Sequence, residues 1–243
     1  MQDADLLTAL VAANEALRST DPADLDRVVP SCPGWSVEDL VAHIAQVQRW
    51  ATRVIAAPPG VKVERRIDAP GGPAIIDWFG DGADALLAAF ATVDLDHEVH
   101  TFVGPRPARW WIRRQTHEAV VHAWDRAHAT GTPGAIDPAV ASDGIDELLT
   151  EFLTPRLVDT SVFAPTGESV HVHTTDVDGE WLVRIAPDRI DVTREHAKGD
   201  VALRGPAADV LLTLYARQRV DQTGAEVLGS ADVLDRLVAA TNF

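Results

Sequence analysis

The spacing of apolar residues changes once along this 243-residue chain, and the change limits the folds open to it. Up to about residue 157, apolar side chains recur at the three- and four-residue spacing of amphipathic helices. Beyond it, stretches such as "SVHVHT" and "EWLVRIA" alternate with the two-residue period of half-buried strands. Helices followed by strands are typical of two domains. We therefore expect a helical domain at 1–157 and a smaller α+β domain at 158–243.

Four helices account for most of the expected helical domain, which predicts a four-helix bundle. Ser36 and Asp39 match a capping box at the start of the second helix. The expected bundle helices span 3–17, 36–57, 78–93 and 109–129, and a fifth helix at 137–157 leads out of the bundle. In the α+β domain, short strands joined by tight turns predict a mostly antiparallel sheet, with helices at 206–219 and 230–240.

Acidic residues outnumber basic ones by 37 to 21, which gives a formal net charge of −16. Such a charge repels phosphate backbones and anionic lipid, so we expect small-molecule partners, with no nucleic acid and no membrane. The first residues, "MQDADLLTAL", lack the basic and apolar regions of a signal peptide. A cytoplasmic location is expected, and the oligomeric state is left open.

Cys32 is the single cysteine of the chain. One cysteine excludes an internal disulfide and any metal site built from several thiolates. A buried, inert thiol is the expectation for Cys32. The chain then has no thiol nucleophile of its own.

Glu118 and His122 are four residues apart in "HEAVVHAWD", within the fourth expected helix. This spacing puts both side chains on one helix face, where an oxygen and a nitrogen can bind the same cation. His43 lies among apolar residues of the second helix and is expected to face the bundle interior. Bundles hold metals with inward His and Glu side chains from facing helices. The alternatives are a structural ion pair for Glu118 and His122 and a core histidine at 43.

The stretches "VPSCPGWSVEDLVAHIAQVQRW" and "RRQTHEAVVHAWD" resemble two signatures of the mycothiol-dependent maleylpyruvate isomerase family. "VHVHTTDVDGEWLVR" and "LRGPAADVLLTLYAR" are similar to the family's C-terminal domain. The resemblance implies a DinB-like four-helix bundle followed by a sterol-carrier-like α+β domain. It also implies a metal site with His43, Glu118 and His122 as ligands, and this ligand count is that of a catalytic zinc site with a vacant fourth position.

The resemblance implies an enzyme that uses Zn²⁺, or another divalent metal, with mycothiol or a related low-molecular-weight thiol. In the family's name reaction the metal-bound thiolate adds to the cis double bond of maleylpyruvate. The resulting single bond rotates, and elimination gives fumarylpyruvate. One alternative is an S-transferase that adds the thiol to electrophilic toxins or metabolites. Another is a non-enzymatic module that binds a small molecule and contains a structural metal.

Two carboxylates lie close enough in sequence to a predicted ligand histidine to accept its second ring N–H. Asp39 precedes His43 by four residues, and Asp125 follows His122 by three. A helix-capping role explains Asp39 equally well. For Asp125, a purely structural role is an equal alternative.

An anionic substrate of an acidic protein needs a cation near the metal. Arg113 and Arg114 precede the Glu/His pair by about one turn, and Arg217 and Arg219 end the helix expected at 206–219. We expect Arg217 or Arg113 to bind the substrate carboxylate. A solvated helix face explains the first pair, and complementation of a helix dipole explains the second.

His171 and His173 are two residues apart on an expected strand, so they share one face of the sheet. They either approach the bundle or occupy a half-exposed sheet face. The sequence does not choose between these two explanations.

Overall fold

The computed structural model describes residues 1–132, 134–153, 158–164 and 166–240. The chain divides into two compact units, Met1–Ala135 and Ile136–Phe243. The fold class is confirmed, because the first unit is helical and the second contains a sheet with helices. The expected boundary after residue 157 falls on residues 154–157, which lie outside the described residues. The division in the structure comes earlier in the chain.

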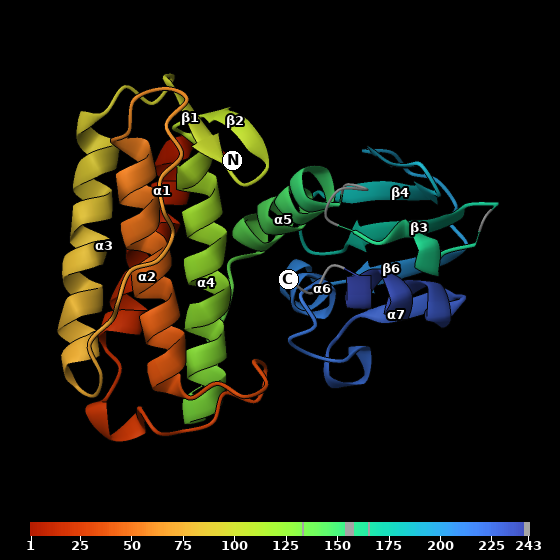
Figure 1. Cartoon of the computed structure of the whole chain (residues 1–243). Coiled ribbons are helices and arrows are strands. Elements are labelled where there is room, and N and C mark those ends of the chain that lie inside the picture. The colour runs from red at the N-terminus through yellow and green to blue at the C-terminus, as the bar shows by residue number, and fades with distance from the viewer. Residues whose placement is uncertain (133, 154–157, 165, 241–243) are drawn as a thin grey trace. The chain divides into compact units, whose positions relative to one another are not determined.

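The first unit is a bundle of four long helices with a short hairpin (Figure 1). Helices α1 and α2 each pack against both α3 and α4, which closes the bundle around a common apolar core. The hairpin of β1 and β2 precedes α4 and was not expected from the sequence. The elements are α1 (Asp3–Arg18), η1 (Pro22–Asp24), α2 (Val37–Ile55), α3 (Ala74–Thr92), β1 (Glu98–Thr101), β2 (Gly104–Pro107) and α4 (Trp110–Thr130).

Helix α3 begins at Ala74, one turn earlier than expected, and its two glycines lie within the regular helix. A Cβ at Gly80 would lie 3.2 Å from Arg18 Nε, and one at Gly82 would lie 3.2 Å from Arg49 Cγ. Two arginine side chains thus lie against the α3 backbone. Glycine lowers helix propensity, but here it lets the two arginine side chains approach the helix closely.

The helix expected at 137–157 belongs to the second unit. It is regular over α5 (Pro138–Glu147) and continues as the π-helical η2 (Leu148–Phe152). Ser142 Oγ donates to the carbonyl oxygen of Asp178, and Trp181 Nε1 donates to Asp146 Oδ1 at 2.8 Å. These bonds join the helix to the strand region, which explains why the units divide before it.

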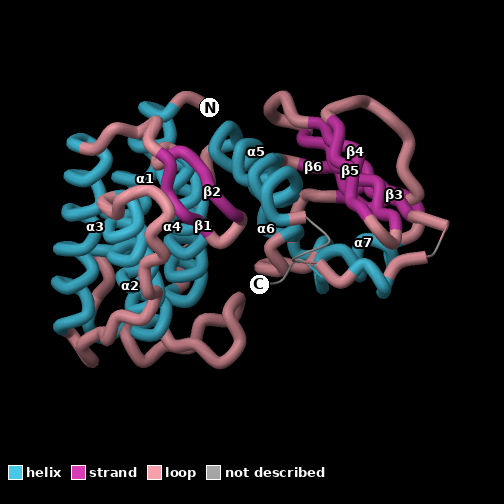
Figure 2. Tube along the Cα trace, turned by 45° about the horizontal axis from the view of Figure 1, so that its top comes forward, coloured by secondary structure: helices cyan, strands magenta, loops and turns pink. Residues whose placement is uncertain are grey.

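The second unit has a five-stranded sheet in the order β5-β4-β3-β6-β7. Only the β3–β6 pair is parallel among these described strands, so the mostly antiparallel sheet is confirmed. Figure 2 shows the strands with α6 and α7 beside them, and both helices pack against β3 and β6. The remaining elements are η3 (Thr160–Val162), β3 (Glu168–Thr174), β4 (Glu180–Ala186), β5 (Arg189–Thr193), β6 (Val201–Gly205), α6 (Ala207–Leu214), η4 (Val220–Gln222), β7 (Glu226–Gly229) and α7 (Ala231–Ala240).

Helix α6 is shorter than the expected range of 206–219. It ends at Leu214, and Ala216 adopts a left-handed backbone with φ of 54°. A left-handed residue cannot continue a right-handed helix. Arg217 therefore lies in the segment after the helix and not on its last turn.

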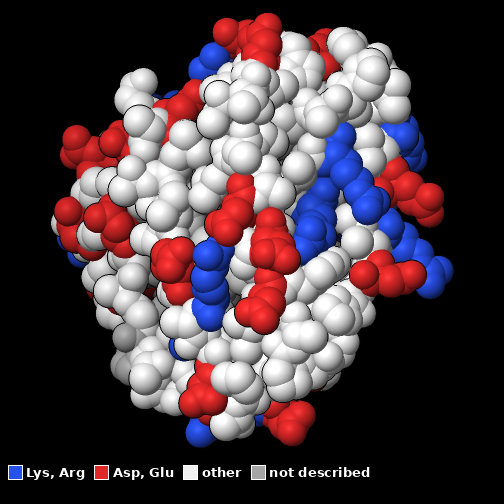
Figure 3. All heavy atoms as spheres, turned by 90° about the vertical axis from the view of Figure 1, so that its left-hand side faces the viewer, with Lys and Arg blue, Asp and Glu red and all other residues white. Residues whose placement is uncertain are grey.

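Acidic and basic side chains are interspersed on the face drawn in Figure 3. Acidic groups are spread over much of this face, as expected from the net charge of −16. Among the described helices, none combines the length and the apolar composition that a bilayer span requires.

Candidate metal centre

Helix α2 carries the first expected ligand, His43, and a capping box fixes where this helix begins. Ser36 Oγ accepts a hydrogen bond from Asp39 N at 3.1 Å, and Asp39 Oδ2 accepts one from Ser36 N at 2.9 Å. This reciprocal pair satisfies two backbone N–H groups at the helix start. His43 follows Asp39 by four residues, or about one turn, next to the buried Leu40 and Ile44.

The Asp39 carboxylate is thus part of the helix cap. Hydrogen bonds from the backbone N–H and the hydroxyl of Ser36 hold the pKa of Asp39 below its usual value. This arrangement agrees with the capping role that the sequence left open. Support of the His43 ring by Asp39 stays a prediction.

Helix α4 carries Glu118 and His122, and their donor atoms converge with that of His43 from α2. Glu118 Oε1 lies 3.0 Å from His43 Nε2 and 3.7 Å from His122 Nε2. The three ligand atoms all lie within 4.8 Å of one another. Residues 75 positions apart in sequence therefore meet in the bundle, and their role as metal ligands stays a prediction.

These distances fit a divalent cation. Zinc binds histidine nitrogen and carboxylate oxygen at about 2.0–2.2 Å, so two ligands at a tetrahedral angle lie about 3.4 Å apart. The observed separations of 3.0 and 3.7 Å bracket this value. Three protein donors leave a coordination position for a further ligand.

Arg114 holds the second oxygen of the Glu118 carboxylate. Its Nη2 donates to Glu118 Oε2 at 2.6 Å, and the Arg114 side chain is only 7 % exposed. Burial alone raises the pKa of Glu118, but the charge of Arg114, the hydrogen bond from His43 and the charge of His122 hold it well below its usual value. Glu118 is therefore ionised near neutral pH, with Oε1 directed at the two histidines.

Asp125 stands behind His122 and is fully buried. Its Oδ2 lies 2.9 Å from His122 Nδ1, an ion-pair distance at which the ring N–H is not aligned as a regular hydrogen bond. Ser31 Oγ donates to Asp125 Oδ1 at 2.6 Å, and Cys32 Sγ donates to Oδ2 at 3.4 Å. With the ring N–H of His122 turned toward it, the Asp125 carboxylate would keep the proton on Nδ1 and leave Nε2 for a metal.

Cys32, His122 and Asp125 also have donor atoms close enough to share a cation. Cys32 is 8 % exposed, however, and its thiol already donates to the Asp125 carboxylate. His122 would have to bind through Nδ1 in such a set. The set with His43 and Glu118 uses Nε2 and keeps the buried Asp125 contacts, so we favour it.

Trp35 borders the site and was not among the residues predicted from the sequence. Its ring centroid lies 4.9 Å from that of His43 and 5.8 Å from that of His122, nearly parallel to the latter. A hydrogen bond from Val29 N to the Trp35 carbonyl oxygen at 2.9 Å closes the loop that precedes α2. The sequence signal that could have identified Trp35 was its position in "SCPGW", between Cys32 and the capping residue of α2.

The two arginines expected to bind substrate lie in different units. Arg113 is half-buried on α4, next to Arg114. Arg217 belongs to the second unit, where its Nη1 donates to the Tyr215 carbonyl oxygen at 3.0 Å. Their catalytic roles stay predictions.

A known family model covers the part of the chain that holds His43, Glu118 and His122. The family model described as the mycothiol maleylpyruvate isomerase N-terminal domain matches residues 6–127, a range that contains the three donors. This chain belongs to that family. The residues that match the mycothiol maleylpyruvate isomerase model run from α1 into α4.

Two solved structures share the fold. The crystal structure of the mycothiol-dependent maleylpyruvate isomerase is similar with a TM-score of 0.63, and that of a point mutant with 0.65. Each match has 17 % sequence identity and covers 93 % of both chains. At this identity, the likeness shows the fold of both units.

Two uncharacterized proteins of Mycobacterium tuberculosis, from strains CDC 1551 / Oshkosh and ATCC 25618 / H37Rv, are also similar. Each is 31 % identical over 126 residues, which is 45 % of this chain. The match spans 57 % of the length of each relative.

Proposed function

We propose that this chain is a metal-dependent enzyme that uses mycothiol, or a related thiol, to isomerise an unsaturated keto acid of the maleylpyruvate type. The observation that carries the proposal is the convergence of the donor atoms of His43, Glu118 and His122. A metal held by three protein donors would keep a position for a further ligand. Family membership and the shared fold support the same reaction class.

A divalent cation at this site would act as a Lewis acid that favours the thiolate form of a thiol near neutral pH. His43 and His122 would present Nε2 to it, and Glu118 would present Oε1. Arg114 keeps the Glu118 carboxylate ionised and oriented. The Trp35 ring lies against the two imidazoles on one side.

The charges around the donors favour an anionic ligand. Arg114 compensates Glu118, the two imidazoles are neutral when they ligate, and Asp125 contributes one further negative charge. A dication in this setting keeps an excess positive charge. That excess stabilises a thiolate or a substrate carboxylate in a protein that is otherwise strongly acidic.

The nucleophile would come from a separate molecule, because Cys32 is buried and hydrogen-bonded to Asp125. We expect isomerisation of maleylpyruvate by the metal-loaded chain to require an added thiol, with mycothiol far more effective than glutathione. The assay follows isomerisation and conjugation of a generic electrophile with each thiol and without thiol. Cys32→Ser, which keeps a donor to Asp125, is the control and should retain activity.

Full activity without thiol, or its loss in Cys32→Ser at unchanged metal content, would contradict the proposal. Conjugation without isomerisation would instead identify an S-transferase with the same centre. That outcome would replace the isomerase assignment and keep the metal and thiol.

The substrate carboxylate still needs a cation, and we propose that Arg217 or Arg113 supplies it. Loss of one charge-assisted hydrogen bond costs about 1.5–3 kcal/mol, so alanine at the responsible position should lower kcat/KM about 10- to 100-fold at unchanged metal content. The matched control is Arg189→Ala, because Arg189 is exposed and paired with Asp191. Unchanged kinetics in both Arg217→Ala and Arg113→Ala would reject these two residues.

A further inference from the structure

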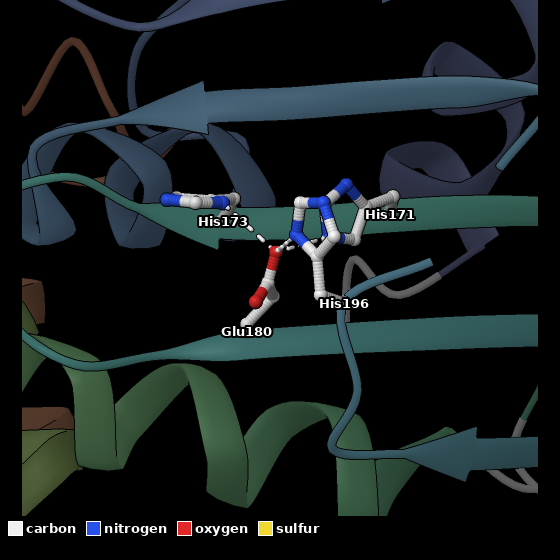
Figure 4. Close-up of side chains that lie close together, drawn as sticks. All are labelled: His171, His173, Glu180 and His196. Atoms are coloured by element: carbon white, nitrogen blue, oxygen red, sulfur yellow. Dashed lines mark hydrogen bonds and ion pairs between the residues drawn. The ribbon is translucent and has the colours of Figure 1, made fainter. Parts of the chain in front are cut away.

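A second group of metal-binding side chains lies in the second unit, apart from the family's donor set. His171 and His173 on β3, Glu180 on β4 and His196 in the loop between β5 and β6 have donor atoms within 4.8 Å of one another. Figure 4 shows the three imidazoles directed at one oxygen of the glutamate. Glu180 Oε1 lies 2.9 Å from His171 Nε2, 3.0 Å from His173 Nδ1 and 2.5 Å from His196 Nδ1.

The sheet register builds three of the four positions. His171 and His173 are two residues apart on β3 and share a face, and Glu180 on β4 is the antiparallel partner of His173. The neighbouring Val170 and Val172 point to the opposite face, where they are fully buried. On the histidine face, His171 is buried and His173 and Glu180 are partly exposed.

The C-terminal end of the loop that carries His196 is attached to β3. Asp200 Oδ2 accepts hydrogen bonds from Ser169 N at 2.7 Å and from Ser169 Oγ at 2.8 Å. A Cβ at Gly199 would lie only 2.9 Å from His171 N, so the loop backbone runs directly against the strand. These contacts hold the segment after His196 next to β3, although the His196 side chain itself is 81 % exposed.

Hydrogen bonding alone accounts poorly for this arrangement. A carboxylate oxygen has about two lone-pair sites, yet three ring nitrogens meet at Glu180 Oε1. Each nitrogen would also need to carry its proton on the side that faces the glutamate. A cation between the four groups instead accepts one lone pair from each of them.

The cationic groups beside the cluster have carboxylate partners of their own. Arg204 pairs in register with His173, and its Nη1 contacts Glu226 Oε1 at 2.7 Å. Arg184 also lies nearby on β4, and its Nη1 contacts Glu195 Oε1 at 3.0 Å. These two positive charges are thus compensated, which lowers their repulsion of a bound cation.

We propose that His171, His173, Glu180 and His196 bind one divalent transition-metal ion of the zinc class. Imidazole suits Zn²⁺, Cu²⁺ and Ni²⁺, whereas Ca²⁺ and Mg²⁺ take oxygen ligands. Four protein donors are the number in a closed four-coordinate site, and the separations of 2.5–3.0 Å from Glu180 Oε1 would have to widen toward about 3.4 Å to admit an ion. A bound ion would join β3, β4 and the loop before β6. This proposal goes beyond the proposed function, because none of its residues belongs to the bundle site.

Competition titration of the metal-free full chain with Zn²⁺ against a chromophoric chelator tests the proposal. In a His43→Ala/His122→Ala background, which removes the bundle site, we expect one equivalent of zinc to remain. Adding Glu180→Gln or His173→Ala should then weaken this binding at least about 100-fold, since even changes outside the ligand set cost 10- to 100-fold. His100→Ala, an exposed histidine on β1, should change nothing.

A titration without the double background guards against poor folding of that variant. The unsubstituted chain should bind two equivalents, and Glu180→Gln one. If only the bundle proposal fails, the unsubstituted chain binds one equivalent that Glu180→Gln removes and His43→Ala does not. Zinc binding insensitive to both Glu180→Gln and His173→Ala would overturn the second site, as would no binding in the double background together with one equivalent in the unsubstituted chain.

Discussion

Replacing His122 by alanine should lower the zinc affinity of the bundle at least about 100-fold, and thiol-dependent turnover should fall with the metal content. The change removes one of three donors and leaves the buried Asp125 without its imidazole partner. Competition titration in a Glu180→Gln background measures the bundle site alone. Turnover is then followed at limiting zinc.

The control for this experiment lies on the same helix. His128 is exposed and stacks on Trp124 with ring centroids 4.9 Å apart, so His128→Ala should leave zinc affinity unchanged. Asp125→Asn should give an intermediate loss of about 10- to 100-fold, because it disturbs the orientation of His122 and leaves all three donors present. Zinc affinity that stays the same in His122→Ala would return the Glu/His pair to a structural role.

Replacing Arg114 by methionine should destabilise the metal-free protein by about 3 kcal/mol near pH 7. Removing one partner of a buried ion pair costs about 3–5 kcal/mol, and we expect the lower end because the Glu118 side chain is 22 % exposed. The free energy of unfolding in denaturant measures the effect. Saturating zinc should reduce it, because the cation replaces the lost positive charge and binds only the folded site.

The pH dependence of this loss has a defined sign. The pKa of Glu118 in the folded protein lies below its usual value of 4.5, so its ionised form stabilises the fold fully above that pH. The contribution is lost as the pH falls from there toward the folded pKa. The difference between the unsubstituted chain and Arg114→Met should therefore be largest near neutral pH and shrink below about 4.5.

A double-mutant cycle separates this pair from general effects of the substitution. In a Glu118→Gln background, Arg114→Met should cost much less, because no buried carboxylate is left without a partner. An equal cost in both backgrounds would show that Arg114 acts through packing alone.

The sequence predicted the parts of the fold that depend on local pattern. The capping box at Ser36 fixed the start of α2, and the two-residue period identified β3 and β4. The β1–β2 hairpin was missed because each of its strands has only four residues. Prolines at 105 and 107 also weaken the strand pattern of β2.

Local spacing in the sequence likewise predicted some parts of the candidate site and missed others. The four-residue spacing of Glu118 and His122 sets their common face without any tertiary information. The contacts of Asp125 with Ser31 and Cys32 span more than 90 residues, and no spacing rule predicts them. His196 was overlooked for the same reason, since only the folded loop brings it to β3.

All three donors of the bundle site come from α2 and α4, within a unit that ends at Ala135. The proposed ligand set and the second unit are therefore encoded in separate parts of the chain, and a substrate-binding role of Arg217 would link them. After a gene duplication, substitutions can accumulate between Ile136 and the C-terminus while the ligand set is inherited unchanged. A chain built in this way can vary its second unit around a set of donors that the first unit holds entirely.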